Sequence, residues 1–187
     1  MTWIRRIAIV AVIGGVVLLA GGFYLPAKAA LAQVLMLRAW SETEFDPVRP
    51  WPWAETWPVA RLRVPSLGID QIVLAGDEGA ALAFAPGHVD GTAPPGELGN
   101  TVLAGHRDTV FAFLGRLGLG DELELESVDG ARRSYVVTST AVVHERDTSV
   151  LDPTAESTLT LVTCYPLDGT RPGGPLRYVV IARATSL

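Results

Sequence analysis

The sequence is short of cysteine, of histidine and of clustered positive charge, and each shortage excludes a class of site. Its single cysteine, Cys164, permits no intramolecular disulfide and no cysteine-rich zinc site, so the thiol is either buried and inert or reactive. The 3 histidines lack metal-ligand spacing such as HExxH, so we expect no metal and no other cofactor. Lys and Arg are scattered and the net charge is −5, which argues against a nucleic-acid partner.

Long apolar stretches are also few, and the longest is at the N-terminus. Ile7 to Leu25 form an apolar run of 19 residues after Arg5 and Arg6. As a helix this run spans about 30 Å, the thickness of a bilayer core. Because basic residues stay cytoplasmic, we expect a single-pass inner-membrane anchor with the rest of the chain on the periplasmic, extracytoplasmic side. The alternative is a signal peptide cleaved at Ala27-Lys28-Ala29, but the run exceeds the usual h-region of about 7–15 residues.

Composition divides the chain into three parts. Residues 1–30 are the expected cytoplasmic tip and transmembrane anchor, residues 31–58 a juxtamembrane helix and a Pro/Trp-rich linker, and residues 59–187 a folded domain. Prolines in the linker exclude regular helix and favour an extended spacer. The tryptophans of the linker suit either the membrane interface or packing on the domain surface: Trp51, Trp53 and Trp57.

The domain consists of short apolar or alternating segments separated by Gly, Pro and Asp. These segments predict strands near residues 60–64, 69–74, 100–106, 122–126, 134–143, 159–164 and 177–182. One short helix is expected from Thr109 to Leu117, with Asp108 as its cap. Seven or eight short strands with little helix favour a closed or nearly closed β-barrel.

Three polar side chains stand at the ends of predicted strands. Cys164 ends one strand, where Pro166 prevents further pairing, and His106 ends another. Arg177 begins the last strand, 13 residues after Cys164, so the chain returns beside Cys164 as an antiparallel neighbour. We therefore expect the three side chains on one face. A thiolate nucleophile, an imidazole acid–base and a guanidinium for an oxyanion together suit covalent acyl transfer.

Each of these residues also has a structural interpretation. A lone cysteine at a strand end is commonly a small buried hydrophobe, and a lone histidine is commonly a hydrogen-bonded structural residue. An arginine before the last strand is commonly a solvated edge charge. The two other histidines, His88 and His144, have no partner in the pattern and are interpreted as structural or surface residues.

Three motifs resemble those of sortases. Leu159-Thr-Leu-Val-Thr-Cys164 resembles the TLxTC signature of that family, and Ala104-Gly-His-Arg107 is similar to its histidine strand. Arg177-Tyr-Val-Val is similar to the start of the family's terminal strand, at the family's interval from the cysteine. The resemblance covers about Ala60 to Ala182. The run Leu161 to Asp168 is most similar to class D-like sortases of Gram-negative, marine-type proteobacteria.

The resemblance implies a mainly β fold, an eight-stranded sortase-like β-barrel with short helices, after the N-terminal transmembrane helix. It also implies an activity: a membrane-anchored cysteine transpeptidase cleaves an LPxTG-like C-terminal sorting signal between Thr and Gly. The acyl group passes through a thioester on the cysteine to an amine nucleophile, or to water. The implied partners are a protein that bears the signal, an amine acceptor and the membrane.

The resemblance also implies a role for individual residues. His106, Cys164 and Arg177 take the roles of acid–base, nucleophile and oxyanion- or substrate-orienting cation. Three further substrate contacts are implied: Thr163 to the substrate backbone, Leu151 in the loop before the cysteine strand as an apolar contact, and Arg171 as the alternative to Arg177.

The sequence leaves two other functions open. One is a different exported cysteine peptidase acting on peptidoglycan stems, although the short HG…GC block of such families is missing. The other is a non-catalytic envelope module that only binds a partner. Rapid alkylation of the native thiol would separate a catalytic Cys164 from a buried structural one.

Overall fold

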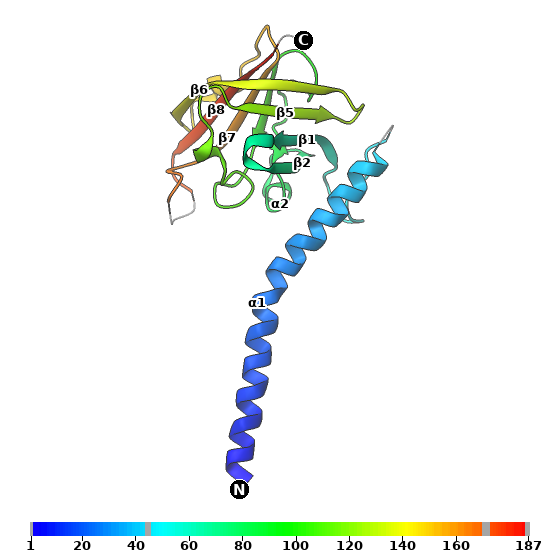
Figure 1. Ribbon diagram of the computed structural model, residues 1–187, viewed down its shortest axis with the longest axis vertical. Coiled ribbons are helices and arrows are strands. Elements are labelled where there is room, and N and C mark those ends of the chain that lie inside the picture. Colours follow the sequence, from blue (N-terminus) through cyan, green and yellow to red (C-terminus); the bar gives the residue numbers. More distant parts are fainter. Residues whose placement is uncertain (1, 44–45, 170–172, 186–187) are drawn as a thin grey trace.

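A long helix leads into a β-barrel in the computed structural model, which describes residues 2–43, 46–169 and 173–185 (Figure 1). The helix, α1, runs without interruption from Thr2 to Glu42. It therefore joins the expected anchor segment and the expected juxtamembrane helix into one element. No helix among the described residues combines the length and the hydropathy needed to cross a membrane. The structure thus confirms a helix at this place, but not the membrane crossing predicted for it.

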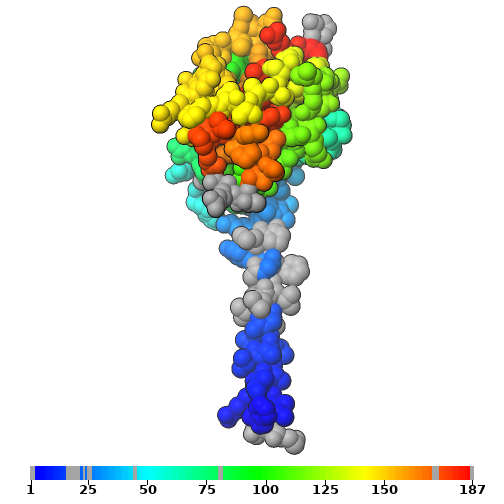
Figure 2. Space-filling view, turned by 90° about the vertical axis from the view of Figure 1, so that its left-hand side faces the viewer, coloured from blue at the N-terminus to red at the C-terminus, as the bar shows by residue number. Residues whose placement is uncertain are grey.

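The two halves of α1 have different surroundings. The N-terminal half extends away from the barrel in both views (Figure 1; Figure 2). The C-terminal half packs on the barrel through one face, where Met36 is buried against Ile72 and Leu74 of the second strand. Residues on its other face, such as Leu31 and Val34, are exposed. One face of the expected juxtamembrane helix thus packs on the barrel of the same chain.

The linker tryptophans differ from one another. Trp51 packs edge-to-face on Phe84 with ring centroids 5.8 Å apart, beside the cluster that holds Met36. Trp57 is half-buried, whereas Trp53 is 80% exposed. Packing on the domain surface is therefore observed for Trp51, one of the two alternatives left open by the sequence.

Eight strands form a closed barrel in the described part of the chain. Their order around it is β1-β2-β3-β4-β7-β8-β6-β5. The strands are β1 (Pro58–Val64), β2 (Ile69–Ala75), β3 (Gly87–His88), β4 (Asn100–Ala104), β5 (Glu122–Ser127), β6 (Arg132–His144), β7 (Thr158–Tyr165) and β8 (Leu176–Ala184). The predicted barrel is confirmed, and β3, only two residues long, is the strand that the sequence pattern did not indicate.

The helices of the barrel region are all short. They are α2 (Gly79–Leu82) and the 3-10 turns η1 (Pro65–Leu67), η2 (Leu114–Arg116) and η3 (Thr148–Leu151). The predicted helix from Thr109 to Leu117 is wrong, because turns occupy residues 107–113 and only η2 is helical. The apolar residues that suggested it, Phe113 and Leu114, are nevertheless buried in the barrel core. Tertiary packing, rather than helix amphipathicity, accounts for their spacing.

Strands β4 and β7 are the most deeply buried part of the sheet. They pair in parallel, and most of their residues are buried because both faces are covered. The cover on one face is the β6–β7 connection, which Asn100 holds by donating to the carbonyls of Val150 (2.9 Å) and Asp152 (3.1 Å). Thr160 donates to the Asn100 amide oxygen at 2.7 Å. This arrangement places η3 above the ends of β4 and β7.

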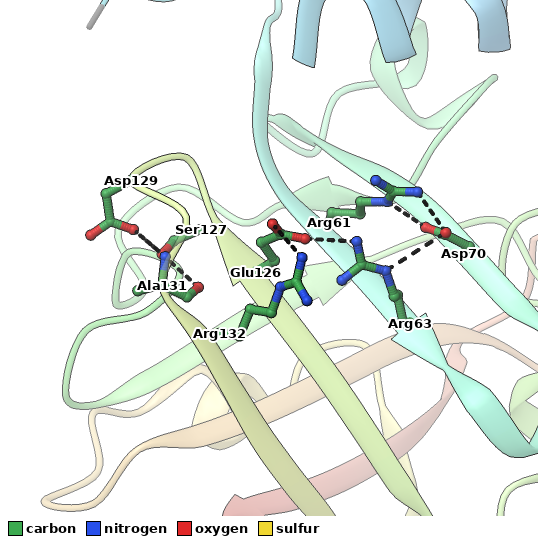
Figure 3. A network of polar contacts seen from close by, with 8 residues as sticks. All are labelled: Arg61, Arg63, Asp70, Glu126, Ser127, Asp129, Ala131 and Arg132. Atoms are coloured by element: carbon green, nitrogen blue, oxygen red, sulfur yellow. Dashed lines mark hydrogen bonds and ion pairs between the residues drawn. The ribbon is translucent and has the colours of Figure 1, made fainter. Parts of the chain in front are cut away.

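Charged side chains on the outside of β1, β2, β5 and β6 form an ion-pair network (Figure 3). Arg61 donates two hydrogen bonds to Asp70, at 2.6 and 2.7 Å. Arg63 lies 2.7 Å from Glu126, which also pairs with Arg132 at 3.3 Å. The Arg61 hydrogen bonds lower the pKa of Asp70 below its ordinary value. Burial alone would raise the pKa of Glu126, but the hydrogen bonds and charges of Arg63 and Arg132 together outweigh burial and lower it.

Candidate active site

Cys164 and Arg177 stand directly opposite each other on neighbouring strands. They are register partners in the antiparallel pair of β7 and β8. Side chains of directly opposed residues project to the same face of a sheet. Cys164 is half-buried and Arg177 is 28% exposed, so both are accessible from the same rim of the barrel. The sequence spacing predicted this neighbourhood.

His106 follows β4, on the other side of β7. Ala104 pairs with Val162 in the parallel ladder, so His106 and Cys164 each lie two residues beyond a paired position. The ladder continues past the strand end, because Gly105 donates its N–H to the Val162 carbonyl at 3.2 Å. The His106 side chain is exposed. The chain thus brings the imidazole, the thiol and the guanidinium to adjacent strand ends.

Thr163 ties these two strand ends together. Its side chain is only 2% exposed, and its hydroxyl donates to the Gly105 carbonyl at 2.7 Å. Because successive side chains alternate across a strand, it points away from the face that carries Cys164. A side chain on Gly105 would contact the ring of Phe111 at 2.7 Å, so the residue before His106 has no room for one. The contact observed for Thr163 is therefore with the histidine segment.

The guanidinium of Arg177 is held by an acid that the sequence motifs did not indicate. Its Nη2 pairs with Glu145 at 2.8 Å, and its Nη1 donates to the carbonyls of Gly174 (2.6 Å) and Leu176 (3.0 Å). Glu145 directly follows β6, where Val143 is the register partner of Arg177. The pairing depends on the β6–β8 register, which no local motif encodes. Arg171, the predicted alternative to Arg177, lies outside the described residues.

A cavity of about 250 Å³ adjoins Arg177. Its walls are mainly apolar and include Val102, Ala104, Val162 and Leu151, the last of which was the predicted apolar contact. Its lining also includes the charged residues Arg177, Glu145, Asp147 and Asp77. The cavity follows the ends of β4 and β7 under the β6–β7 connection. An extended peptide with small apolar side chains suits this shape and lining.

The two remaining histidines differ in position. His88 is hydrogen-bonded within the turn after β3, to the Ala93 carbonyl at 3.0 Å and the Thr92 hydroxyl at 3.1 Å, which fits a structural role. His144 lines the cavity beside Glu145, and its Nδ1 accepts the Arg146 N–H at 3.2 Å. Within the described ranges, no group of three or more His, Cys, Asp or Glu side chains is arranged to hold a metal ion.

Arg107 is the second residue near the site that the sequence motifs did not indicate. It follows His106 and is buried, with its side chain 3% exposed. Its Nη1 donates to the carbonyl of Pro166 at 2.7 Å and its Nε to Asp108 at 2.9 Å. The hydrogen bond to Asp108 raises the pKa of Arg107 above its ordinary value. A buried cation therefore lies between the histidine segment and the loop that follows Cys164.

A larger hollow, of about 700 Å³, lies near the other ends of the same strands. It is lined by Gly96 before β4, Ser157 before β7 and Ala184 at the end of β8. It contains none of the residues predicted for the site. We therefore assign the candidate active site to the smaller cavity and the rim that carries Cys164.

Comparison with known proteins identifies relatives of this chain. A family model described as a sortase domain matches residues 62–185. Sortase D of Bacillus subtilis (strain 168) is 33% identical over 123 residues, which cover 65% of this chain and 61% of that protein. Sortase A of Listeria monocytogenes is 31% identical over 110 residues, which cover 57% and 49%. The chain thus spans less than two thirds of the length of these curated relatives.

Solved structures share the fold. A Clostridium perfringens Sortase D5 transpeptidase superposes with a TM-score of 0.68 at 23% identity, covering 84% of this chain and 99% of that one. Sortase C-1 from Actinomyces oris superposes with a TM-score of 0.62 at 28% identity, covering 70% and 75%. The proteobacterial subgroup suggested by the sequence has no support among these relatives.

Proposed function

The chain belongs to the sortase family, and from this premise we propose that it is a cysteine transpeptidase with Cys164 as nucleophile, His106 as acid–base and Arg177 as oxyanion-binding cation. The observation that carries the proposal is the direct register of Cys164 with Arg177, with the His106 segment bonded to the same strand. These three groups suffice for acyl transfer through a thioester.

In the proposed first half-reaction, the Cys164 thiolate attacks the scissile carbonyl carbon and forms a tetrahedral intermediate. Arg177 donates hydrogen bonds to the resulting oxyanion. When the intermediate collapses, the C–N bond breaks and His106 protonates the leaving amine. The product is a thioester on Cys164. Glu145 pairs with the guanidinium of Arg177, which is the register partner of Cys164. Little movement of the guanidinium is therefore needed when negative charge develops on the oxyanion.

In the second half-reaction, an amine attacks the thioester carbonyl and His106 accepts its proton. Collapse of this second intermediate forms a new amide bond and releases the Cys164 thiolate. Water can take the place of the amine, in which case the product is a free carboxylic acid. The same three residues therefore serve both steps, with His106 alternating between acid and base.

We propose an LPxTG-like sorting signal as the substrate, cleaved between Thr and Gly. The mainly apolar cavity beside Arg177 is compatible with the Leu-Pro part of such a signal, and Leu151 is its proposed apolar contact. The 33% identity to Sortase D of Bacillus subtilis supports a class D-like enzyme. The accepting amine is proposed by chemistry alone, as a primary amine on a second molecule.

We also propose that α1 anchors the protein in the inner membrane, with the barrel on the extracytoplasmic side. The support comes from the apolar run after Arg5 and Arg6 and from exposed apolar side chains on the N-terminal half, including Ile7, Val10 and Ile13. In both views, the described residues that directly follow β7 (166–169, orange) lie on the side of the barrel toward which this half extends (Figures 1 and 2). A membrane-anchored enzyme would then present its site toward the bilayer.

The test of the catalytic proposal is peptide cleavage by the full-length protein in detergent. With an LPxTG peptide and triglycine as the amine, we expect a transpeptidation product and a Cys164 acyl-enzyme detectable by mass. Cys164→Ala loses both, and His106→Ala and Arg177→Ala each lower kcat/KM by roughly 10²-fold or more. Arg183→Ala, on the same strand but 65% exposed, is the matched control and keeps wild-type activity.

Two results would contradict the proposal. The first is the absence of any acyl-enzyme across a broad peptide library. The second is slow iodoacetamide labelling of native Cys164, because a catalytic thiol reacts rapidly and a structural one does not. Slow labelling would instead favour a non-catalytic envelope module.

A further inference from the structure

Arg107 is a buried cation that takes no part in the proposed acyl transfer. It is the only lysine or arginine that is buried among the described residues. Placing a charge in the interior is unfavourable unless hydrogen bonds and opposite charges compensate for the lost water. Such a residue therefore needs a structural or functional explanation, and its place in the chain, next to His106, suggests where to seek one.

The partners of Arg107 connect the two halves of the site. Its Nε donates to Asp108 at 2.9 Å, on its own segment, while its Nη1 donates to the carbonyl of Pro166 at 2.7 Å, two residues beyond Cys164. Attraction to Cys164 and to Asp168 adds to the effect of the Asp108 hydrogen bond in raising the pKa of Arg107, against the opposing effect of burial. The guanidinium thus joins the histidine segment to the start of the β7–β8 loop.

The loop is shaped around this guanidinium. Gly169 donates its N–H to the same Pro166 carbonyl at 3.1 Å, so residues 166–169 close into a turn. A Cβ on Gly169 would lie 2.6 Å from Arg107 Nη1 and 3.1 Å from the Pro166 oxygen. A Cβ on Gly115 would likewise lie 3.0 Å from the side chain of Leu167, which belongs to the same turn. The turn is therefore closely packed, and Arg107 fills the space that any side chain at position 169 would need.

We propose that Arg107 is a positioning residue, which holds the turn after Cys164 against the segment that carries His106 and so aligns the thiol with the imidazole. The proposal rests on the catalytic roles proposed above for these two residues. Its physical basis is that, among the described residues, backbone pairing and the Thr163–Gly105 hydrogen bond join the two strand ends, and the Arg107–Pro166 hydrogen bond adds a link beyond the last paired residues. Misalignment of reacting groups by about 1 Å can slow a reaction by roughly 10²-fold.

Two kinds of variant test the proposal in the full-length protein. Arg107→Ala removes the guanidinium, and we expect kcat to fall about 100-fold while KM changes by less than about threefold. Added methylguanidine should restore part of kcat. Arg107→Lys should retain more activity than Arg107→Ala, because lysine keeps the positive charge although it lacks the planar set of N–H donors of the guanidinium. Gly169→Ala keeps the arginine at position 107, but the added methyl group displaces its guanidinium. We expect kcat to fall about tenfold.

Gly118→Ala is the matched control for Gly169→Ala, since a Cβ there meets nothing within 4 Å. We expect it to keep wild-type kcat. The proposal is overturned if folded Arg107→Ala keeps kcat within about twofold of wild type, or if Gly169→Ala behaves as Gly118→Ala does. If Arg107→Ala does not fold, Gly169→Ala and Arg107→Lys decide, because both keep a cation in the interior.

The alkylation rate of Cys164 separates this proposal from the catalytic one. Wild-type protein that cleaves no peptide would contradict the proposed function, but Cys164 would still report on its surroundings. Because loss of the Arg107–Pro166 hydrogen bond releases the turn after Cys164, the iodoacetamide labelling rate of Cys164 should change at least about threefold in Arg107→Ala and remain unchanged in Gly118→Ala. Equal labelling rates in wild type and Arg107→Ala, together with unchanged kcat, would leave Arg107 with a purely structural role.

Discussion

Glu145 connects β6 to the guanidinium of Arg177 and is the clearest example of a site residue without a sequence motif. The pair is partly exposed, 28% for Arg177 and 44% for Glu145, so it contributes little to the free energy of unfolding. We expect its effect to be on orientation, because the carboxylate pairs with a long, flexible side chain opposite Cys164. A loss of this restraint should therefore change catalysis more than stability.

We expect Glu145→Gln to lower kcat/KM about fivefold. The thermal midpoint should fall by no more than about 4 °C, because an exposed ion pair contributes at most about 1 kcal/mol. Peptide cleavage and thermal unfolding measure the two effects. Glu156→Gln is the matched control, because that side chain is 75% exposed and lies 4.0 Å from Arg183. Equal activity of the two variants would show that Glu145 does not orient Arg177.

Arg107 is another residue whose place beside Cys164 no sequence motif indicates. The sequence presented two arginines as candidates near the cysteine, Arg177 and Arg171, both in the segment after it. The buried cation comes instead from the segment after His106, which is remote in sequence from the Pro166 carbonyl that it binds. Burial and a long-range backbone contact are properties of the folded chain, so no spacing rule identifies them.

At the scale of elements, the ion-pair network of β1, β2, β5 and β6 connects stability to pH (Figure 3). The pKa of Asp70 is lowered in the folded state by the hydrogen bonds from Arg61. A lowered folded-state pKa stabilises the protein above the unfolded-state pKa of about 3.9. This contribution is lost as the pH falls through the folded-state value.

Asp70→Asn should therefore lower the free energy of unfolding by roughly 0.5–1 kcal/mol at pH 7, a small amount because Asp70 is 45% exposed. The difference from wild type should shrink as the pH falls below about 4. Urea unfolding at several pH values measures it. Asp90→Asn, in the exposed turn after β3, is the control. A difference that stays constant down to about pH 2 would contradict the role of the Asp70 charge.

The strands also show which elements a pattern predicts well. The segments that became β1, β5 and β7 alternate or are continuously apolar, and each was predicted within a residue or two of its observed bounds. The two-residue strand β3 has no periodicity to detect. The predicted helix at 109–117 is wrong because Phe113 enters the barrel core from a turn and Leu114 from the 3-10 turn η2, so their spacing reflects tertiary packing.

At the scale of the molecule, α1 serves two surroundings. Its C-terminal half is part of the folded domain, because Met36 is fully buried and Gln33 donates to the Phe84 carbonyl at 2.9 Å. Its N-terminal half has exposed apolar side chains in the described part. A boundary near residue 28 should therefore separate membrane attachment from domain packing.

We expect full-length protein to remain in the membrane fraction after carbonate washing, and a variant lacking residues 1–28 to be soluble with an unchanged thermal midpoint. In spheroplasts, a membrane-impermeant maleimide should label full-length protein at Cys164, the only cysteine, and leave Cys164→Ala unlabelled. Full-length protein in the soluble fraction, or labelling only after lysis, would contradict the proposed anchor and its orientation.

The sequence by itself determined the strand pattern, the position of Cys164 at a strand end and the antiparallel return that places Arg177 beside it. These features depend on periodicity, on Pro166 and on a short chain interval, all of which are local. Only the tertiary structure decided that β4 lies parallel to β7, that α1 packs on β2, and that Glu145 and Arg107 join the site. These contacts depend on which distant segments pack together, and therefore on the closure of the barrel as a whole.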